Sequence, residues 1–291
     1  MVLHGFRNLG LGAGPKPHIV ATGGDIVSDV EIGGLMYRVH TFENTGTFEV
    51  KNLGKSDGQV EYLVVAGGGG GGVRSVGNNY GGGGGGGAGG YRTNVVGQTS
   101  GRNTSAEPAL YVSPQSYTVT VGAGGPGGPL ETSGSNGGTS SFATVSTTGG
   151  GGGGGGLNNG RSGGSGGGGV GYSNDTATAG GSGTANEGFN GSAGFLAAGV
   201  YAGGGAGGGA GSQASTNDSG GTAGVGLSSN ITGSSVVRAA GAKGVTGIGS
   251  GVKGGGDATE KTGNGGEGAE YTTGGNGGSG IVIIRYRLFT E

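Results

Sequence analysis

The chain has 291 residues, of which 89 are glycine and none is cysteine, and its formal net charge is −2. The lack of cysteine excludes disulfide bonds and thiolate metal sites, and the scattered basic residues argue against binding to nucleic acid. Hydrophobic residues make up only 30% of the chain. So few side chains cannot hold a fold together mainly by their own burial, which favours a structural or adhesive role over catalysis.

Residues 1–31 have ordinary composition, and we interpret them as an extended N-terminal attachment arm, with a frayed terminus as the alternative. The apolar residues of this arm lie among glycines, without the spacing of an amphipathic helix; they are Val2, Leu3, Phe6, Leu9 and Leu11. No apolar stretch has the length of a signal-peptide core or of a membrane span. We therefore expect neither a signal peptide nor membrane insertion.

Segments of alternating polarity predict β-strands, and we assign residues 32–291 to one glycine-rich domain. The predicted strands are 35–42, 47–50, 60–65, 116–121 and 280–288. The first two flank Asn44-Thr45-Gly46, which predicts a hairpin. The last is the most hydrophobic, and we expect it to pair with the early strands and close the domain.

Runs of six or more glycines occur at 67–72, 81–87 and 149–156, and shorter glycine-rich segments follow. Glycine costs about 0.5–1 kcal/mol relative to alanine in a helix or strand. The left-handed threefold helix, with three residues per turn, instead lets bare backbones approach closely and form hydrogen bonds sideways. We therefore predict a mainly β fold with a bundle of polyglycine II helices, a small antiparallel sheet closed by the C-terminal strand, and little or no α-helix.

The sequence predicts no catalytic residue, cofactor site or metal site, and we expect no enzyme activity. Glycine patterns of the dinucleotide-binding type arise here from composition alone, and Gly54-Lys55-Ser56 has Glu49 where a phosphate loop requires glycine. The histidines are not spaced for a metal; they are His4, His18 and His40. Four acidic residues near glycines do not match a calcium loop, although a chance cation site is the alternative there; they are Asp257, Glu260, Glu267 and Glu270.

Aromatic residues in the connectors are the one indication of a binding role. Rigidly presented aromatic rings are good contacts for sugars and protein surfaces. The candidate receptor-contact residues are Tyr80, Tyr91, Tyr111, Tyr172 and Tyr201. The alternative is that such residues cover the bundle as small apolar clusters, and Phe189, Phe195 and Leu196 show this pattern most clearly.

Several blocks of sequence occur in a fixed order: 40–42, 46–50, 61–66 before polyglycine, 117–125, 137–142 and 277–286. Together, over residues 32–288, they resemble the glycine-rich domain of bacteriophage tail fibre and adhesin proteins. The resemblance implies polyglycine II helices with variable surface loops that bind host receptors. It also implies a virion protein that is assembled in the host cytoplasm and exposed outside the cell.

The partners expected from this resemblance are other virion or filament proteins, bound through the N-terminal arm, and polysaccharide or protein of the host surface. Further copies of the chain are expected in a homo-oligomer of three or more. A second function stays open, in which the chain is a purely structural subunit of a fibre, extracellular filament or capsid appendage. Filaments formed by the isolated protein would favour this second function, and discrete monomers or trimers would favour host recognition.

Overall fold

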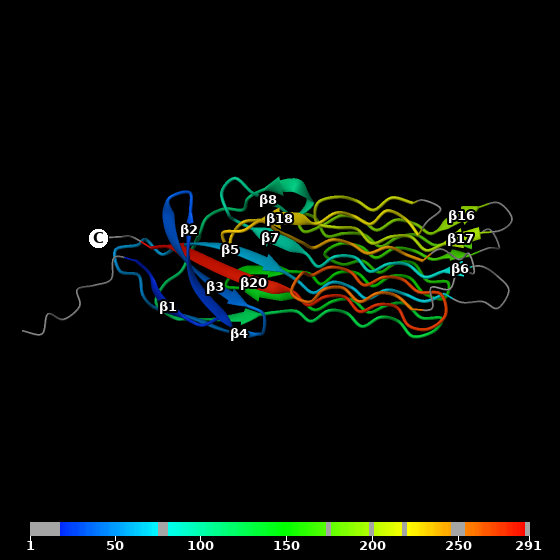
Figure 1. The fold of residues 1–291 in the computed structure, drawn as a ribbon, viewed down its shortest axis with the longest axis horizontal. Helices are drawn as coiled ribbons and strands as arrows, with labels where there is room; N and C mark the ends of the chain where they lie inside the picture. Colours follow the sequence, from blue (N-terminus) through cyan, green and yellow to red (C-terminus); the bar gives the residue numbers. More distant parts are fainter. Residues whose placement is uncertain are drawn as a thin grey trace, which may run out of the picture.

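A computed structural model describes residues 18–74, 81–172, 176–197, 201–216, 220–245 and 254–288. The molecule is elongated, with a β-rich base at one end and extended glycine segments that run from the base toward the opposite, distal end (Figure 1). No α-helix occurs in the described ranges, where a 3-10 turn at Gly101–Asn103 is the one helical element. The fold is mainly β, as predicted.

Two open antiparallel sheets form the base. The first has the order β1-β4-β11-β12-β13, with β1 (Val20–Thr22), β4 (Gly46–Asn52), β11 (Ser116–Thr120), β12 (Ser140–Phe142) and β13 (Val145–Thr147). The second has the order β10-β5-β20-β3-β2, with β10 (Leu110–Tyr111), β5 (Gln59–Val65), β20 (Ile281–Arg287), β3 (Leu35–Phe42) and β2 (Ile26–Ile32). Strand β7 (Tyr91–Thr93) also pairs with β5. Because β20 lies between β3 and β5, the predicted closure by the C-terminal strand is confirmed.

Two further hairpins accompany these sheets. Strand β8 (Thr99–Ser100) pairs with β9 (Thr104–Ser105), and β18 (Leu227–Ser229) pairs with β19 (Val236–Arg238). Both lie along the same flank of the base (Figure 1).

The predicted hairpin through Asn44-Thr45-Gly46 is wrong. Strands β3 and β4 belong to different sheets, so this turn carries the chain from one sheet to the other. Asp25 holds the corner, because its Oδ2 accepts hydrogen bonds from the N–H groups of Glu43 at 2.7 Å and Asn44 at 3.0 Å. The hairpin partner of β3 is instead β2, joined through Gly33-Gly34, whose φ angles of 60° and 78° suit a two-residue turn.

Apolar side chains cover both faces of the second sheet. The layer between the two sheets includes Phe42, Phe48, Phe142, Val282 and Ile284. The layer on the outer face includes Leu63, Tyr91, Ile231, Ile281 and Ile283. Strand β20 is therefore buried on both faces, which explains why its sequence is a continuous apolar run rather than an alternating one.

The glycine segments form a lattice in which hydrogen-bond partners repeat every three residues. In segment 67–73, N–H groups three residues apart donate to the same neighbouring segment, and the three neighbours are 132–138, 275–278 and 84–87. The carbonyl groups accept from three other segments, which are 150–156, 125–128 and 266–269. These N···O distances are 2.8–3.0 Å. Three residues per turn and six surrounding segments are the geometry of packed polyglycine II helices.

The lattice requires glycine because neighbouring backbones leave no room for a Cβ atom. A Cβ added at Gly69 would lie 2.2 Å from the carbonyl oxygen of Gly151, and one added at Gly86 would lie 2.0 Å from that of Gly69. The short spacing also allows Cα–H···O contacts, worth about 0.5–1 kcal/mol each. Glycine therefore serves here for close approach rather than for turns.

At the rim of the lattice, side chains replace the missing neighbours. Asn136 Oδ1 accepts a hydrogen bond from the Gly152 N–H at 3.0 Å, and Asn276 Oδ1 accepts one from the Gly127 N–H at 3.0 Å. Asn264 Oδ1 likewise accepts one from the Ala240 N–H at 2.9 Å. The Asn264-Gly265 and Asn276-Gly277 pairs, which resemble turn signals, lie in extended segments instead. These asparagines satisfy outward N–H groups that no helix covers.

The described part of the predicted arm belongs to the base. Strand β1 pairs with β4, and β2 pairs with β3 along its whole length. Ile19 and Ala21 are buried in the layer between the sheets, which fixes this stretch to the folded region. Residues 1–17, with all five apolar candidates for attachment, lie outside the described residues.

Candidate functional site

Short strands gather at the distal end (Figure 1). They are β6 (Gly81–Gly82), β14 (Gly171–Tyr172), β15 (Thr176–Ala177), β16 (Phe195–Ala197) and β17 (Tyr201–Gly203). The first three form one sheet in the order β15-β14-β6, and the last two form a hairpin. The chain emerges here from the lattice, so side chains larger than a methyl group are again accommodated.

Tyr172 and Arg74 form the centre of the distal end. The Arg74 guanidinium lies 4.5 Å from the centroid of the half-buried Tyr172 ring, within the range of a cation–π contact. Arg74 is only 7% exposed, and its Nη1 is ion-paired with Glu131. Its buried Nε atom has no hydrogen-bond partner. The site therefore presents an aromatic ring held in place by a buried cation.

Glu270 adds a buried carboxyl group to the same end of the lattice. It follows Ala269, which forms a parallel bridge with Val73 and accepts a hydrogen bond from the Arg74 N–H at 3.2 Å. Glu270 is 3% exposed, and burial raises the pKa of its carboxyl group. Its Oε2 atom has no hydrogen-bond partner, and the next residue, Tyr271, is 40% exposed. The exposed ring of Tyr271, rather than the buried carboxyl group of Glu270, is therefore the part of this stretch that a partner could contact.

The other aromatic candidates lie in different places. Tyr91 is fully buried under the second sheet, so its assignment as a contact residue is wrong; its apolar ring is needed in the core. Tyr111 is 58% exposed but belongs to β10 of the base. Tyr201 is the first residue of β17 at the distal end, and Tyr80 lies outside the described residues.

The expected apolar cover is made of half-buried residues. Phe195 and Leu196 are half-buried on β16. Phe189 is also half-buried, and the Arg102 guanidinium lies 5.3 Å from its ring centroid. These side chains pack on the molecule rather than projecting from it.

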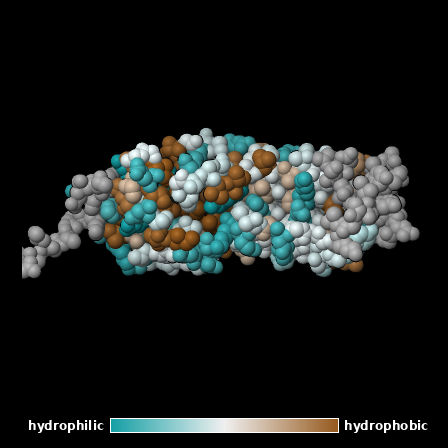
Figure 2. Space-filling view, viewed as in Figure 1, coloured by the Kyte–Doolittle hydropathy of each residue, from teal (hydrophilic) through white to brown (hydrophobic). Residues whose placement is uncertain are grey.

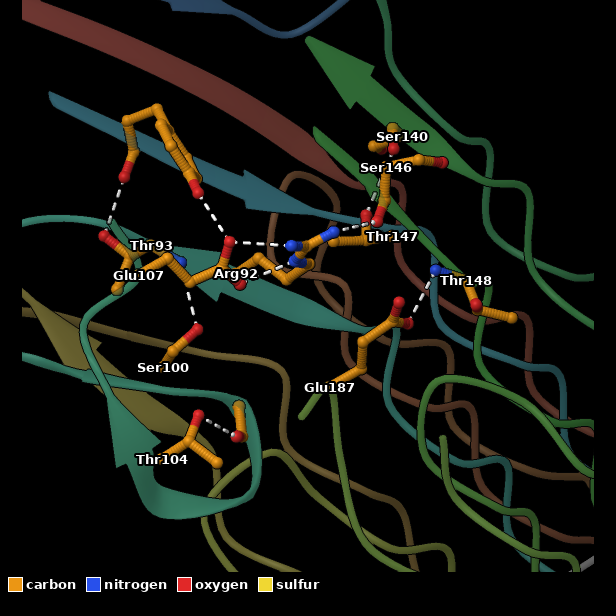
Figure 3. Close-up of polar contacts among 12 residues, drawn as sticks. Arg92, Thr93, Ser100, Thr104, Glu107, Ser140, Ser146, Thr147, Thr148 and Glu187 are labelled. Atoms are coloured by element: carbon orange, nitrogen blue, oxygen red, sulfur yellow. Dashed lines mark hydrogen bonds and ion pairs between the residues drawn. The ribbon is translucent and has the colours of Figure 1, made fainter. Parts of the chain in front are cut away.

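A second polar cluster joins the base to the lattice and was not predicted (Figure 3). Arg92 Nε and Nη2 donate hydrogen bonds to Glu107 Oε1 and Oε2 at 2.6 and 2.7 Å. The Tyr62 hydroxyl also donates to Glu107 Oε2 at 2.7 Å, and burial, followed by this hydrogen bond, raises the pKa of Tyr62. Arg92 and Glu107 line a surface groove of about 530 Å³. Both oxygens of Glu107 are thus occupied by partners within the protein.

Glu187 lines the same groove from the lattice side (Figure 3). It is 8% exposed, its Oε2 accepts a hydrogen bond from the Thr148 N–H at 2.7 Å, and burial raises its pKa. Its carbonyl oxygen accepts a hydrogen bond from the Tyr91 N–H at 3.2 Å. Glu187 therefore links β7 of the base to the lattice, which gives this cluster a structural role. Sequence reasoning missed it because its members are far apart along the chain.

Within the described ranges, no group of three or more His, Asp or Glu residues is placed to hold a metal ion. The four acidic candidates at 257, 260, 267 and 270 instead serve separate purposes: Asp257, for example, accepts a hydrogen bond from the Asn276 N–H at 2.7 Å. Of the helices searched in the same residues, none is long and apolar enough to cross a membrane.

Comparison with protein families gives one match. A model described as a glycine-rich domain matches residues 43–287, which include the lattice and the strands of the base from β4 to β20 but not β1, β2 or β3. No curated protein matches the sequence.

Proposed function

Because the chain belongs to the glycine-rich domain family, we propose that it is a virion structural protein, a phage tail fibre or adhesin component that presents its distal surface for host recognition. The observation that carries this proposal is the separation of two ends by a rigid lattice. Strands β1 and β20, near the two ends of the described chain, lie in the base, and β14 to β17 lie at the opposite end (Figure 1). An attached base and a projecting distal end suit presentation of a binding surface.

Rigidity supports this proposal. Interior segments of the lattice are held by hydrogen bonds to six neighbours, and side chains along the rim satisfy outward N–H groups. A surface carried on such a support loses little conformational entropy when it binds, and this increases affinity. Loops on a rigid scaffold are also where recognition residues concentrate in proteins.

The distal chemistry favours polysaccharide or protein of the host surface as the ligand. Tyr172 and Tyr271 supply amphipathic rings, and the buried Arg74 guanidinium holds the Tyr172 ring in place. Sugar rings and protein surfaces both offer apolar faces with hydroxyl, amide or charged groups beside them. Under this proposal the protein assembles in the host cytoplasm and is exposed outside the cell on the virion.

Binding to whole bacterial cells tests the proposal. Labelled wild-type protein, Tyr172→Ala and Tyr111→Ala are titrated onto a panel of strains, and thermal melts confirm that each variant is folded. We expect Tyr172→Ala to bind at least tenfold more weakly and Tyr111→Ala, an exposed tyrosine of the base, to bind normally. Equal binding by all three proteins, or no binding to any strain, contradicts recognition through the distal end. Periodate or protease treatment of the cells then distinguishes polysaccharide from protein ligands.

A purely structural subunit is the second candidate function, favoured by the long edge of β2 that no described strand covers. Such an edge is a template for assembly with another chain. Filaments formed by the purified protein, seen by electron microscopy together with an absence of cell binding, would support this function over host recognition.

A further inference from the structure

Among the described strands, the seven-residue strand β2 has one edge that pairs with no neighbour. It ends the second sheet, and no other described strand pairs with its outer side. In a two-residue hairpin the residues that flank the turn form a hydrogen-bonded pair, and such pairs then alternate along the strands. Ile32 and Leu35 are that first pair. Val27, Asp29 and Glu31 therefore direct their N–H and C=O groups away from β3, where an added strand would find them.

The side chains of this edge are partly apolar and partly acidic. Ile26 is 51% exposed and Val27 is 49% exposed, although both are β-branched residues that normally pack in sheets. Glu31 is also exposed, while Asp29 is bound by the Arg38 guanidinium at 2.7 Å. The complementary strand would carry apolar residues and positive charge. Main-chain hydrogen bonds would supply the affinity of the added strand, and the apolar and acidic side chains of β2 would determine its register.

Residues 1–17 have this complementary chemistry. They include Arg7 and Lys16, contain no acidic residue, and carry the five apolar residues of the predicted arm. They precede His18 directly, and the charge of His18 contributes, after the Arg38 hydrogen bond, to the lowered pKa of Asp29. The described chain begins two residues before β1 in the base. A stretch of 17 residues reaches about 55–60 Å when extended, which is enough to contact a neighbouring molecule.

We propose that residues 2–11 of one copy add as a strand along β2 of a second copy, joining molecules at the base. Pro15 and Pro17 favour a second copy over the arm's own β2, since neither has an N–H for a ladder and each restricts the backbone to extended conformations. Lys16, between them, is restricted in the same way. A stretch restricted to extended conformations between the apolar residues and His18 disfavours a tight reversal of the arm onto its own β2. This inference concerns the base alone and does not depend on what the distal end binds.

Disulfide trapping tests the contact in the full-length chain, because the natural sequence has no cysteine. A Leu3→Cys chain and a Glu31→Cys chain with tags of different size are mixed under a glutathione redox buffer. We expect the mixed disulfide to exceed the same product made with Glu49→Cys by at least tenfold. Glu49 is the matched control, because it is a partly exposed glutamate on β4 of the first sheet.

Equal trapping at positions 31 and 49, or trapping at neither, overturns the proposal. A chain with both Leu3→Cys and Glu31→Cys separates docking onto a second copy from docking onto the same chain. We expect its crosslinked dimers to increase with protein concentration. A crosslink within single chains at every concentration would show that the arm covers its own β2 and would overturn the proposal.

Sedimentation equilibrium supplies an independent readout. Replacing the five apolar arm residues by serine should weaken self-association at least tenfold. Thermal melts at protein concentrations too low for association should stay unchanged, because the substitutions lie outside the described base. Glu31→Lys should also weaken self-association and Glu49→Lys should not. Self-association of the serine variant at wild-type strength would overturn the proposal.

Discussion

The base and the lattice are both well buried, but by different groups. In the base, rings and branched side chains such as Phe48 and Ile283 fill the space around the sheets. In the lattice, backbone packs on backbone, and segment 81–90 is buried throughout although it has only one side-chain carbon, in Ala88. On the face shown in Figure 2, strongly apolar and polar surface gathers over the base, and the lattice surface is paler.

This difference has consequences for tolerance to change. A core made of side chains accepts a substituted side chain of similar volume, because the surrounding rotamers can adjust. A backbone lattice has no rotamers, so an added carbon meets a carbonyl group that is itself fixed by hydrogen bonds. The base should therefore tolerate conservative substitution, and the interior of the lattice should tolerate none. Four substitutions test this contrast.

Gly86→Ala should have the largest effect. Its Cβ would lie 2.0 Å from the Gly69 carbonyl oxygen, and we expect a loss of unfolding free energy of more than about 4 kcal/mol, beyond ordinary overpacking. Chemical denaturation provides the measurement. Gly203→Ala is the matched control, because its Cβ would meet nothing closer than 3.6 Å. Similar losses for both variants would show that the cost belongs to glycine in general and not to the lattice.

Phe48→Ala should destabilise the base by about 3–4 kcal/mol, through lost burial and the cavity left behind. The Phe48 ring is fully buried, with ring centroids 5.1 Å from His40 and 5.7 Å from Phe142. Phe48→Leu should cost less than half as much, because neighbouring side chains can change rotamer and fill part of the lost volume. Equal losses for the two variants would mean that the base is as intolerant of altered shape as the lattice.

Glu187→Gln tests how the contact between the base and the lattice contributes to stability at different pH values. Burial raises the pKa of Glu187 above its ordinary value of 4.5. Its contribution to stability is thus present below pH 4.5 and is lost as the pH rises through the raised pKa. The variant lacks this dependence, so its unfolding free energy relative to wild type should increase with pH across that window. Chemical denaturation at several pH values provides the measurement, and Glu49→Gln is the control. The same change of unfolding free energy with pH in both variants would contradict this expectation.

Asn136→Ala should have the smallest effect, about 0.5–1.5 kcal/mol. It removes the side-chain acceptor of the Gly152 N–H, but water can reach this exposed rim position. Asn136→Asp keeps the acceptor for the Gly152 N–H but loses the Nδ2 donor to the Ser162 carbonyl oxygen, so it should recover only part of the loss. A loss as large as that of Gly86→Ala would mean that the rim matters as much as the interior of the lattice.

The main architecture could be predicted from the sequence because long runs of residues without side chains must be stabilised by contacts between backbones. Long glycine runs have few regular structures open to them, and an apolar strand such as 281–287 needs neighbours on both sides. The lattice also contains segments that glycine content alone does not reveal. One of them is 132–138, where Ser133 Oγ and Asn136 Oδ1, three residues apart, accept hydrogen bonds from the Gly155 and Gly152 N–H groups of a neighbouring segment.

The site was harder to predict than the fold. Tyr91 and Tyr172 both follow glycine runs, yet one ring is in the core and the other is at the distal end. What separates them is tertiary placement: β7 pairs with β5 of the base, whereas β14 lies where the lattice ends. Arg74 and Glu131 form an ion pair although they are 57 residues apart in the sequence, and no local sequence pattern predicts such a contact.

The six-neighbour packing of segment 67–73 also bears on how the protein is made. Gly68 donates its hydrogen bond to Gly278, about 210 residues later. At about 5–20 residues per second, a ribosome needs roughly 10–40 s to supply that acceptor. During this interval the early glycine tract has only water as a partner on one side. The lattice therefore cannot close around its first tract until residues 275–278 have been made, and this late tract completes the structure that the early one began.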